Sequence, residues 1–203
     1  PREGFVEGDV FYHPVLKFQF PIPKDWQTVN TPARVQIAPK DGKAVILFTL
    51  AQGQSLNTAK QAAIAEDSLK VIDSREIKVN GNNAIEMTAD LNPQVRLLMY
   101  LILYDGKIYK FAGLSETPNF SSYKSTFERV FKGFDDLTDP AKLNAKPERL
   151  AIKTVSKDAT LQDALKSFDL PQARLNEMAI LNSMQLTDKV KKGTLIKVVE
   201  KGK

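Results

Sequence analysis

The chain has no cysteine, one histidine and one tryptophan among its 203 residues. Without cysteine it can form neither disulfide bonds nor a thiolate metal site. The single histidine, His13, rules out an HExxH zinc motif and a histidine-rich metal centre, and it leaves little room for a Ser-His-Asp triad. Gly42, Gly81 and Gly106 all belong to predicted turns, so no glycine-rich phosphate loop is expected either. We therefore expect this chain to carry no catalytic residue, no metal and no cofactor.

Long apolar runs are also lacking. The two longest, 44–50 and 97–104, are far shorter than the roughly 18 residues that a transmembrane helix requires. We interpret both as buried strands and expect no transmembrane segment. The absence of cysteine fits either a cytosol or a Gram-negative periplasm.

The net charge of +5 is unevenly distributed. Residues 150–203 carry ten basic and six acidic side chains, a net charge of +4. This excess comes mainly from lysines, without the interleaved arginines and exposed aromatic residues that a nucleic-acid surface uses. We therefore interpret it as a solvated lysine face and expect no nucleic-acid partner.

The first two thirds of the chain predict an α+β sandwich over residues 15–134. Three turn signals, Asp41-Gly42, Asn80-Gly81 and Asp105-Gly106, separate apolar runs and predict an antiparallel sheet. The predicted strands cover 16–20, 33–38, 44–51, 77–79, 84–89, 97–104 and 108–112, and the two predicted helices cover 56–71 and 122–132. The second helix carries an aromatic stripe, which is typical of a helix that packs on a sheet.

Three other segments complete the predicted domain organisation. Residues 1–14 are polar and contain glycine, so they resemble a connection from an upstream domain, and Tyr12 and His13 are candidate contacts with that domain. Residues 135–149 change in composition and contain two prolines, which predicts a linker. Residues 150–203 follow the order strand, helix, helix, strand, and predict a small second domain.

That second domain resembles a LysM module, a βααβ fold that binds glycans containing N-acetylglucosamine, such as peptidoglycan. The resemblance rests on residues 155–161, 181–182 and 190–198, and Asp158-Ala159 replaces the usual Gly-Asp. A purely structural domain of this type is the alternative. By analogy, two loops would line the glycan groove: Lys157, Asp158, Ala159 and Thr160 in the first, and Asn182, Ser183, Met184, Gln185 and Leu186 in the second.

The first domain resembles the PsbP/Mog1-type sandwich in its order of elements, in the opening 18–26 and in the aromatic helix that ends near Phe131. With its LysM-like end, and with residues 7–14 leading into Phe18-Gln19-Phe20-Pro21 and Trp26, the whole chain resembles the C-terminal region of bacterial cell-envelope zinc metallopeptidases related to the CAAX-processing enzymes. In that family the HExxH domain lies upstream. The resemblance implies that zinc and any protease activity belong to residues outside this chain.

These observations lead to one functional hypothesis and two alternatives. The leading hypothesis is a non-catalytic accessory region, in the periplasm or cell envelope, that positions an upstream catalytic domain on its substrate, the cell wall or a partner protein. The first alternative is a free-standing peptidoglycan-binding protein of the envelope. The second is a hydrolase whose site the sequence does not disclose, since one fold hosts many functions.

Overall fold

The computed structural model describes residues 4–146 and 148–201. Residues 1–3, 147 and 202–203 lie outside the described part; they belong to the predicted upstream connection, the predicted linker and the end of the predicted second domain. The chain divides into two compact units, of which the first ends at Ala145 and the second begins at Lys146.

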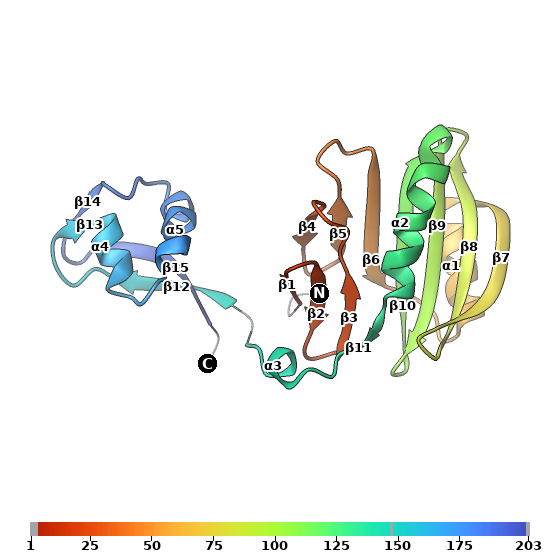
Figure 1. The fold of residues 1–203 in the computed structure, drawn as a ribbon, viewed down its shortest axis with the longest axis horizontal. Coiled ribbons are helices and arrows are strands. Elements are labelled where there is room, and N and C mark those ends of the chain that lie inside the picture. Colours follow the sequence, from red (N-terminus) through yellow and green to blue (C-terminus); the bar gives the residue numbers. More distant parts are fainter. Residues whose placement is uncertain (1–3, 147, 202–203) are drawn as a thin grey trace. The chain divides into compact units, whose positions relative to one another are not determined.

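A seven-stranded antiparallel sheet forms the centre of the first unit, with the strand order β4-β5-β6-β10-β9-β8-β7 (Figure 1). The strands are β4 (Gln27–Asn30), β5 (Val35–Ala38), β6 (Ala44–Leu50), β7 (Lys70–Val79), β8 (Asn82–Asn92), β9 (Val95–Tyr104) and β10 (Lys107–Glu116). Both residues of the Asn80-Gly81 and Asp105-Gly106 turns have positive φ, as two-residue hairpins require. The predicted antiparallel arrangement is confirmed, although the sequence did not indicate β4.

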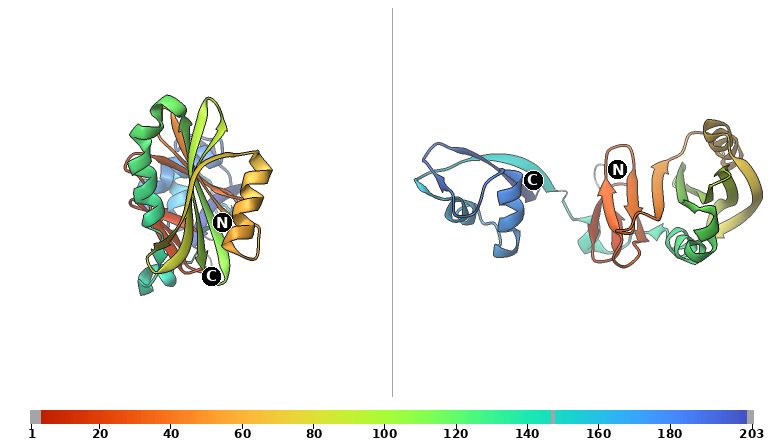
Figure 2. Two further views of the ribbon diagram at one scale, coloured as in Figure 1. Left: turned by 90° about the vertical axis from the view of Figure 1, so that its right-hand side faces the viewer. Right: turned by 90° about the horizontal axis from the view of Figure 1, so that it is seen from above.

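Two helices cover opposite faces of this sheet, as Figure 2 (left) shows: α1 (Leu56–Asp67) and α2 (Phe120–Lys132), the latter preceded by the 3-10 turn η1 (Thr117–Asn119). The predicted aromatic stripe of α2 faces the sheet, and Phe127 and Phe131 are fully buried. Helix α1 buries Ala59 and Ala63. It ends four residues earlier than predicted, because Ser68 adopts the left-handed conformation and the chain enters β7 at Lys70.

A second, four-stranded sheet corrects the prediction that residues 1–14 form only a connection. Its order is β1-β2-β3-β11, and its strands are β1 (Phe5–Glu7), β2 (Val10–His13), β3 (Phe18–Pro21) and β11 (Asp135–Asp136). Phe11 is fully buried, and its ring stacks on Phe20 at a centroid distance of 4.8 Å. The hydrophobic effect thus keeps this segment in the sandwich.

The boundary between the units also differs from the predicted linker 135–149. Asp135–Asp136 pairs with β3, and the short helix α3 (Pro140–Leu143) begins after Asp139, whose side chain accepts a hydrogen bond from the Ala141 amide. Glu148 already belongs to the first strand of the second unit. Within the predicted linker, residues 137–139 and 144–146 therefore lie outside helices and strands.

The second unit has the predicted βααβ order. Its elements are β12 (Glu148–Thr154), β13 (Ala159–Thr160), α4 (Leu161–Lys166), the 3-10 turn η2 (Gln172–Arg174), α5 (Leu175–Leu181), β14 (Lys189–Val190) and β15 (Leu195–Lys201). Strands β12 and β15 pair antiparallel, and β13 pairs with β14. Leu161, Leu165, Leu175 and Met178 are fully buried and form a separate small core.

Candidate functional site

The two loops predicted to line a glycan groove both belong to the second unit and are linked through the segment that follows the second loop. Strand β13 lies in the first loop, and β14 follows the second loop. The two strands pair, with Ala159 opposite Val190 and Thr160 opposite Lys189. Two further backbone hydrogen bonds join the start of α4 to the end of the second loop and the residues after it: Leu161 N–H donates to the Asp188 carbonyl at 2.8 Å, and Gln162 N–H donates to the Leu186 carbonyl at 3.0 Å. The first predicted loop is therefore fixed against residues 186–190, at and just after the end of the second.

Several of the predicted loop residues have structural roles instead of free side chains. The Thr160 hydroxyl caps α4 by accepting from the Asp163 amide, and the Asp158 carboxylate accepts from the Lys192 amide at 2.8 Å. Met184 and Leu186 pack against the core of the unit. These side chains hold the loops in place through contacts within the protein. They differ in this from the free, exposed side chains that contact a ligand.

Asn182 is the clearest of these structural residues. Its side-chain oxygen accepts from the Lys197 amide at 2.7 Å, and its side-chain nitrogen donates to the Lys197 and Met178 carbonyls, both at 2.8 Å. The amide thus joins the end of α5 to β15, and its hydrogen-bonding groups face the protein. Ala159 is half-buried and contributes backbone pairing, so the exposed predicted residues with free side chains are Lys157, Ser183 and Gln185.

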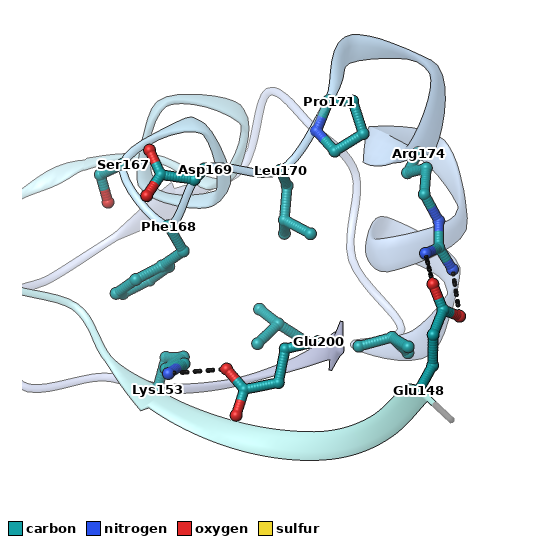
Figure 3. Close-up of a pocket in the computed structure, with 11 residues that line it drawn as sticks. Glu148, Lys153, Ser167, Phe168, Asp169, Leu170, Pro171, Arg174 and Glu200 are labelled. Atoms are coloured by element: carbon teal, nitrogen blue, oxygen red, sulfur yellow. Dashed lines mark hydrogen bonds and ion pairs between the residues drawn. The ribbon is translucent and has the colours of Figure 1, made fainter. Parts of the chain in front are cut away.

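A pocket of the second unit lies between the α4–α5 connection and the β12–β15 sheet. It has a volume of about 630 Å³, within the range typical of ligand sites. Phe168, Leu170, Pro171 and Val199 supply its apolar surface (Figure 3). Glu148 and Lys153 of β12 and Val198, Val199 and Glu200 of β15 line this pocket on the strand side. The residues that line it include none of the predicted loop residues.

Ion pairs surround the pocket. The Arg174 guanidinium binds both the Glu148 carboxylate and the Glu177 carboxylate, and these partners raise its pKa. On the strand side, Lys153 Nζ lies 2.9 Å from Glu200 Oε2 (Figure 3). Arg149 contacts Glu200 Oε1 at 3.3 Å. Hydrogen bonds and charge from Lys153, followed by those from Arg149, lower the pKa of Glu200.

The sequence did not disclose this pocket. Its residues are separated by up to 52 positions and meet only because β12 pairs with β15. The one local signal is the Asp169-Leu170-Pro171 break between the two helices, where Asp169 has a φ of 61°. Such a break predicts a turn, and it indicates nothing about a cavity.

Tyr12 and His13, the predicted contacts with an upstream domain, are both engaged within the first unit. His13 is 3 % exposed, its Nδ1 accepts from the Leu16 amide at 3.1 Å, and its ring lies 5.2 Å from the ring of Phe18. Tyr12 packs on Phe5, and the Lys142 ammonium lies 5.3 Å from its ring centroid. Both side chains are thus anchored by their own sandwich.

Within residues 4–146 and 148–201, no group of three or more histidine, aspartate or glutamate side chains is placed to hold a metal ion. Over the same described residues, no helix has both the length and the hydropathy needed to cross a membrane.

No protein-family model matches the chain, and no curated protein matches it significantly in sequence. Similar solved structures exist. The solution structure of cyanobacterial PsbP (CyanoP) from Synechocystis sp. PCC 6803 has a TM-score of 0.52 and 13 % identity, and the match covers 66 % of this chain and 96 % of that one. The Saccharomyces cerevisiae Ran-binding protein Mog1p gives a TM-score of 0.41 and 11 % identity, over 60 % and 90 % of the two chains.

A structure from Bacteroides thetaiotaomicron VPI-5482 matches over 97 % of this chain and 87 % of that one, with a TM-score of 0.47 and 12 % identity. At such low identities a structural match reveals the fold and leaves function open. The mixed α+β fold with a PsbP/Mog1-like sandwich, predicted from the sequence, is confirmed.

Proposed function

We propose that this chain is a non-catalytic accessory region that attaches to envelope glycan through its second unit and so positions an upstream zinc metallopeptidase domain. The observation that carries the proposal is the backbone pairing that fixes the first predicted loop and the start of α4 against residues 186–190, at and just after the end of the second predicted loop. Loops that are separate in the sequence but fixed against each other form a preorganised site, which reduces the entropic cost of binding.

Lys157, Ser183 and Gln185 are the proposed glycan contacts. All three are exposed, and their side chains have no hydrogen-bond or ion-pair partner among residues 4–146 and 148–201. An ammonium, a hydroxyl and a carboxamide together offer donors and acceptors that suit sugar hydroxyls and acetamido groups. Asp158, Thr160 and Asn182 fix the backbone beneath them.

The accessory role and the periplasmic or envelope location rest on the sequence resemblance carried by residues 7–26 and by the LysM-like end. In this proposal the zinc ion and the catalytic residues belong to the upstream domain. The first unit would connect that domain to the glycan-binding unit or contact an envelope protein. A free-standing glycan-binding protein of the envelope would use the same surface.

A peptidoglycan pull-down tests the glycan-binding part. We expect the wild-type chain to sediment with purified insoluble peptidoglycan and the double variant Lys157→Ala/Gln185→Ala to remain largely in the supernatant. The double variant Lys197→Ala/Gln172→Ala changes the same two residue types at exposed positions outside the loops, and it should sediment like the wild type. Equal sedimentation of the two double variants, or no sedimentation of the wild type, would contradict the proposal.

A further inference from the structure

The pocket lined by Phe168 and Leu170 has the features of a separate binding site. In Figure 3, Phe168 and Leu170 point from the α4–α5 connection toward the strands, and Arg174 with Glu148 closes one side. Phe168, Leu170 and Val199 are each only partly buried, although all three pack against the small core. An apolar side chain placed between them would remove this remaining surface from water, which is favourable.

Two charged groups that line this pocket retain free bonding capacity. The Lys153 ammonium uses one of its three donors for Glu200, and Glu200 also has Arg149 as a partner. The Asp169 carboxylate has no ion pair or hydrogen bond with any residue in the described part of the chain. One cation and one anion therefore remain available to a ligand.

The other charged side chains of the pocket are already neutralised. Arg174 binds Glu148 and Glu177 with three of its nitrogens, and Glu148 accepts through both oxygens. Arg174 and Glu148 line one side of the pocket, and their charges are balanced by one another. Selectivity should accordingly come from Lys153, Asp169 and the apolar surface between the helices and the sheet.

We propose that this pocket binds a short zwitterionic peptide with an apolar first side chain. The apolar side chain would occupy the space beside Phe168 and Leu170, the terminal carboxylate would bind Lys153, and the terminal ammonium would bind Asp169. A volume of about 630 Å³ accommodates a dipeptide or tripeptide. The inference does not depend on glycan binding, because the two loops share no residue with this pocket.

Amide chemical shifts of the labelled full chain, followed by NMR during titration with the dipeptide Leu-Ala, test the proposal. We expect shifts at residues 167–171 and 198–200. Acetyl-Leu-Ala-amide, which lacks both charges, and Gly-Gly, which lacks the apolar side chain, should each bind at least about tenfold more weakly.

Two variants assign the charged contacts. Lys153→Gln and Asp169→Asn should each weaken Leu-Ala binding about tenfold, the effect of losing one charge-assisted hydrogen bond. Asparagine tolerates the left-handed conformation at position 169, and Arg149 still pairs with Glu200 when Lys153 is replaced, so both variants should fold. Lys197→Gln, on the opposite face of the same sheet, should leave binding unchanged.

Absence of shifts at residues 167–171 with millimolar Leu-Ala would overturn the proposal. Equal binding of Leu-Ala and its blocked form would also overturn it, because apolar contact alone would then explain the affinity. Either result would leave the peptidoglycan pull-down unaffected, so failure of this inference is distinguishable from failure of the proposed function.

Discussion

Glu86 brings a carboxylate into the core of the first unit, where it is 8 % exposed. The Tyr100 hydroxyl donates to its Oε2 at 2.5 Å, and Arg75 Nε donates to its Oε1 at 2.7 Å. The guanidinium of Arg75 remains largely exposed. The carboxylate thus lies between a buried phenol and a surface cation, and both partners stabilise its charge.

Tyr100→Phe removes one of these partners and leaves the rest of the buried ring in place. We expect the free energy of unfolding to fall by about 1–3 kcal/mol, because Glu86 would keep a desolvated oxygen without a donor. Urea unfolding measures this change. Tyr123→Phe is the control, since the Tyr123 hydroxyl has no hydrogen bond within the described residues, and a similar loss in this variant would contradict the assignment.

Acid should weaken the same interaction. Burial by itself raises the pKa of Glu86, but the hydrogen bonds from Tyr100 and Arg75 and the charges of Arg75 and Lys132 outweigh it, so the pKa lies below its ordinary value. A carboxyl with a lowered folded-state pKa stabilises the fold above its unfolded pKa of about 4.3, and this contribution is lost as the pH falls through the folded pKa.

We would therefore measure the free energy of unfolding from neutral pH down to values below the unfolded pKa. This pH series distinguishes the effect of Glu86→Gln from that of a control variant. Glu86→Gln should be less stable than the wild type at neutral pH and should lose less stability on acidification. Glu76→Gln, at an exposed position on the neighbouring strand, should follow the wild-type curve. Parallel curves for wild type and Glu86→Gln would show that the charge contributes nothing.

Asn182 gives a prediction for the second unit. Asn182→Asp keeps the acceptor for the Lys197 amide but loses the donors to the Met178 and Lys197 carbonyls. We expect the second unit to lose about 1–3 kcal/mol of stability. The rate of amide hydrogen exchange in this unit measures the loss. Asn176→Asp, at an exposed position on α5, is the matched control, and an unchanged exchange rate in Asn182→Asp would restore Asn182 as a candidate glycan contact.

At the scale of elements, the packing of α2 on the sheet depends on one glycine. A Cβ atom at Gly113 in β10 would lie 2.5 Å from Cγ of Phe127, which is fully buried. The absence of a side chain on the strand therefore allows an aromatic ring on the helix to approach the backbone closely.

Gly113→Ala should lower the free energy of unfolding by about 1–3 kcal/mol, the usual cost of overpacking a core. The cost should shrink in a Phe127→Leu background, where the smaller side chain leaves room for the methyl group. Chemical unfolding of the two single variants and the double variant measures the coupling. Additive losses would mean that the cost of Gly113→Ala does not come from the Phe127 ring and that the contact does not determine the helix position.

The elements that the sequence predicted well are those whose signal is local. Helix α2 has a periodic aromatic stripe, and the hairpins contain Asn-Gly and Asp-Gly turns. Strands β1 and β2 were mistaken for a connection because the sequence around Gly8 is polar and short. Their assignment depends on Phe11 reaching the rings of Phe20 and Phe48, a contact between distant segments that no local pattern reveals.

At the scale of the whole molecule, the sequence indicated two units, the βααβ order of the second, and the order of the first without β1, β2, β4, β11 and α3. It located the two loops of the second unit by resemblance, but it did not distinguish exposed Lys157 from structural Asn182, because that difference arises from hydrogen bonds to β15. The pocket near Phe168 was missed for a similar reason, since its charged residues come from β12, β15 and the α4–α5 connection, which are far apart in the unit's sequence.

The central claim is that the second unit binds glycan through its paired loops. Amide shifts of the full chain during titration with a soluble N-acetylglucosamine tetramer test it most directly. We expect saturable shifts at residues 157–160 and 183–187, with the first unit unchanged, and loss of these shifts in the Lys157→Ala/Gln185→Ala variant. An absence of shifts in the wild-type loops at millimolar tetramer, or shifts confined to other surfaces, would contradict it.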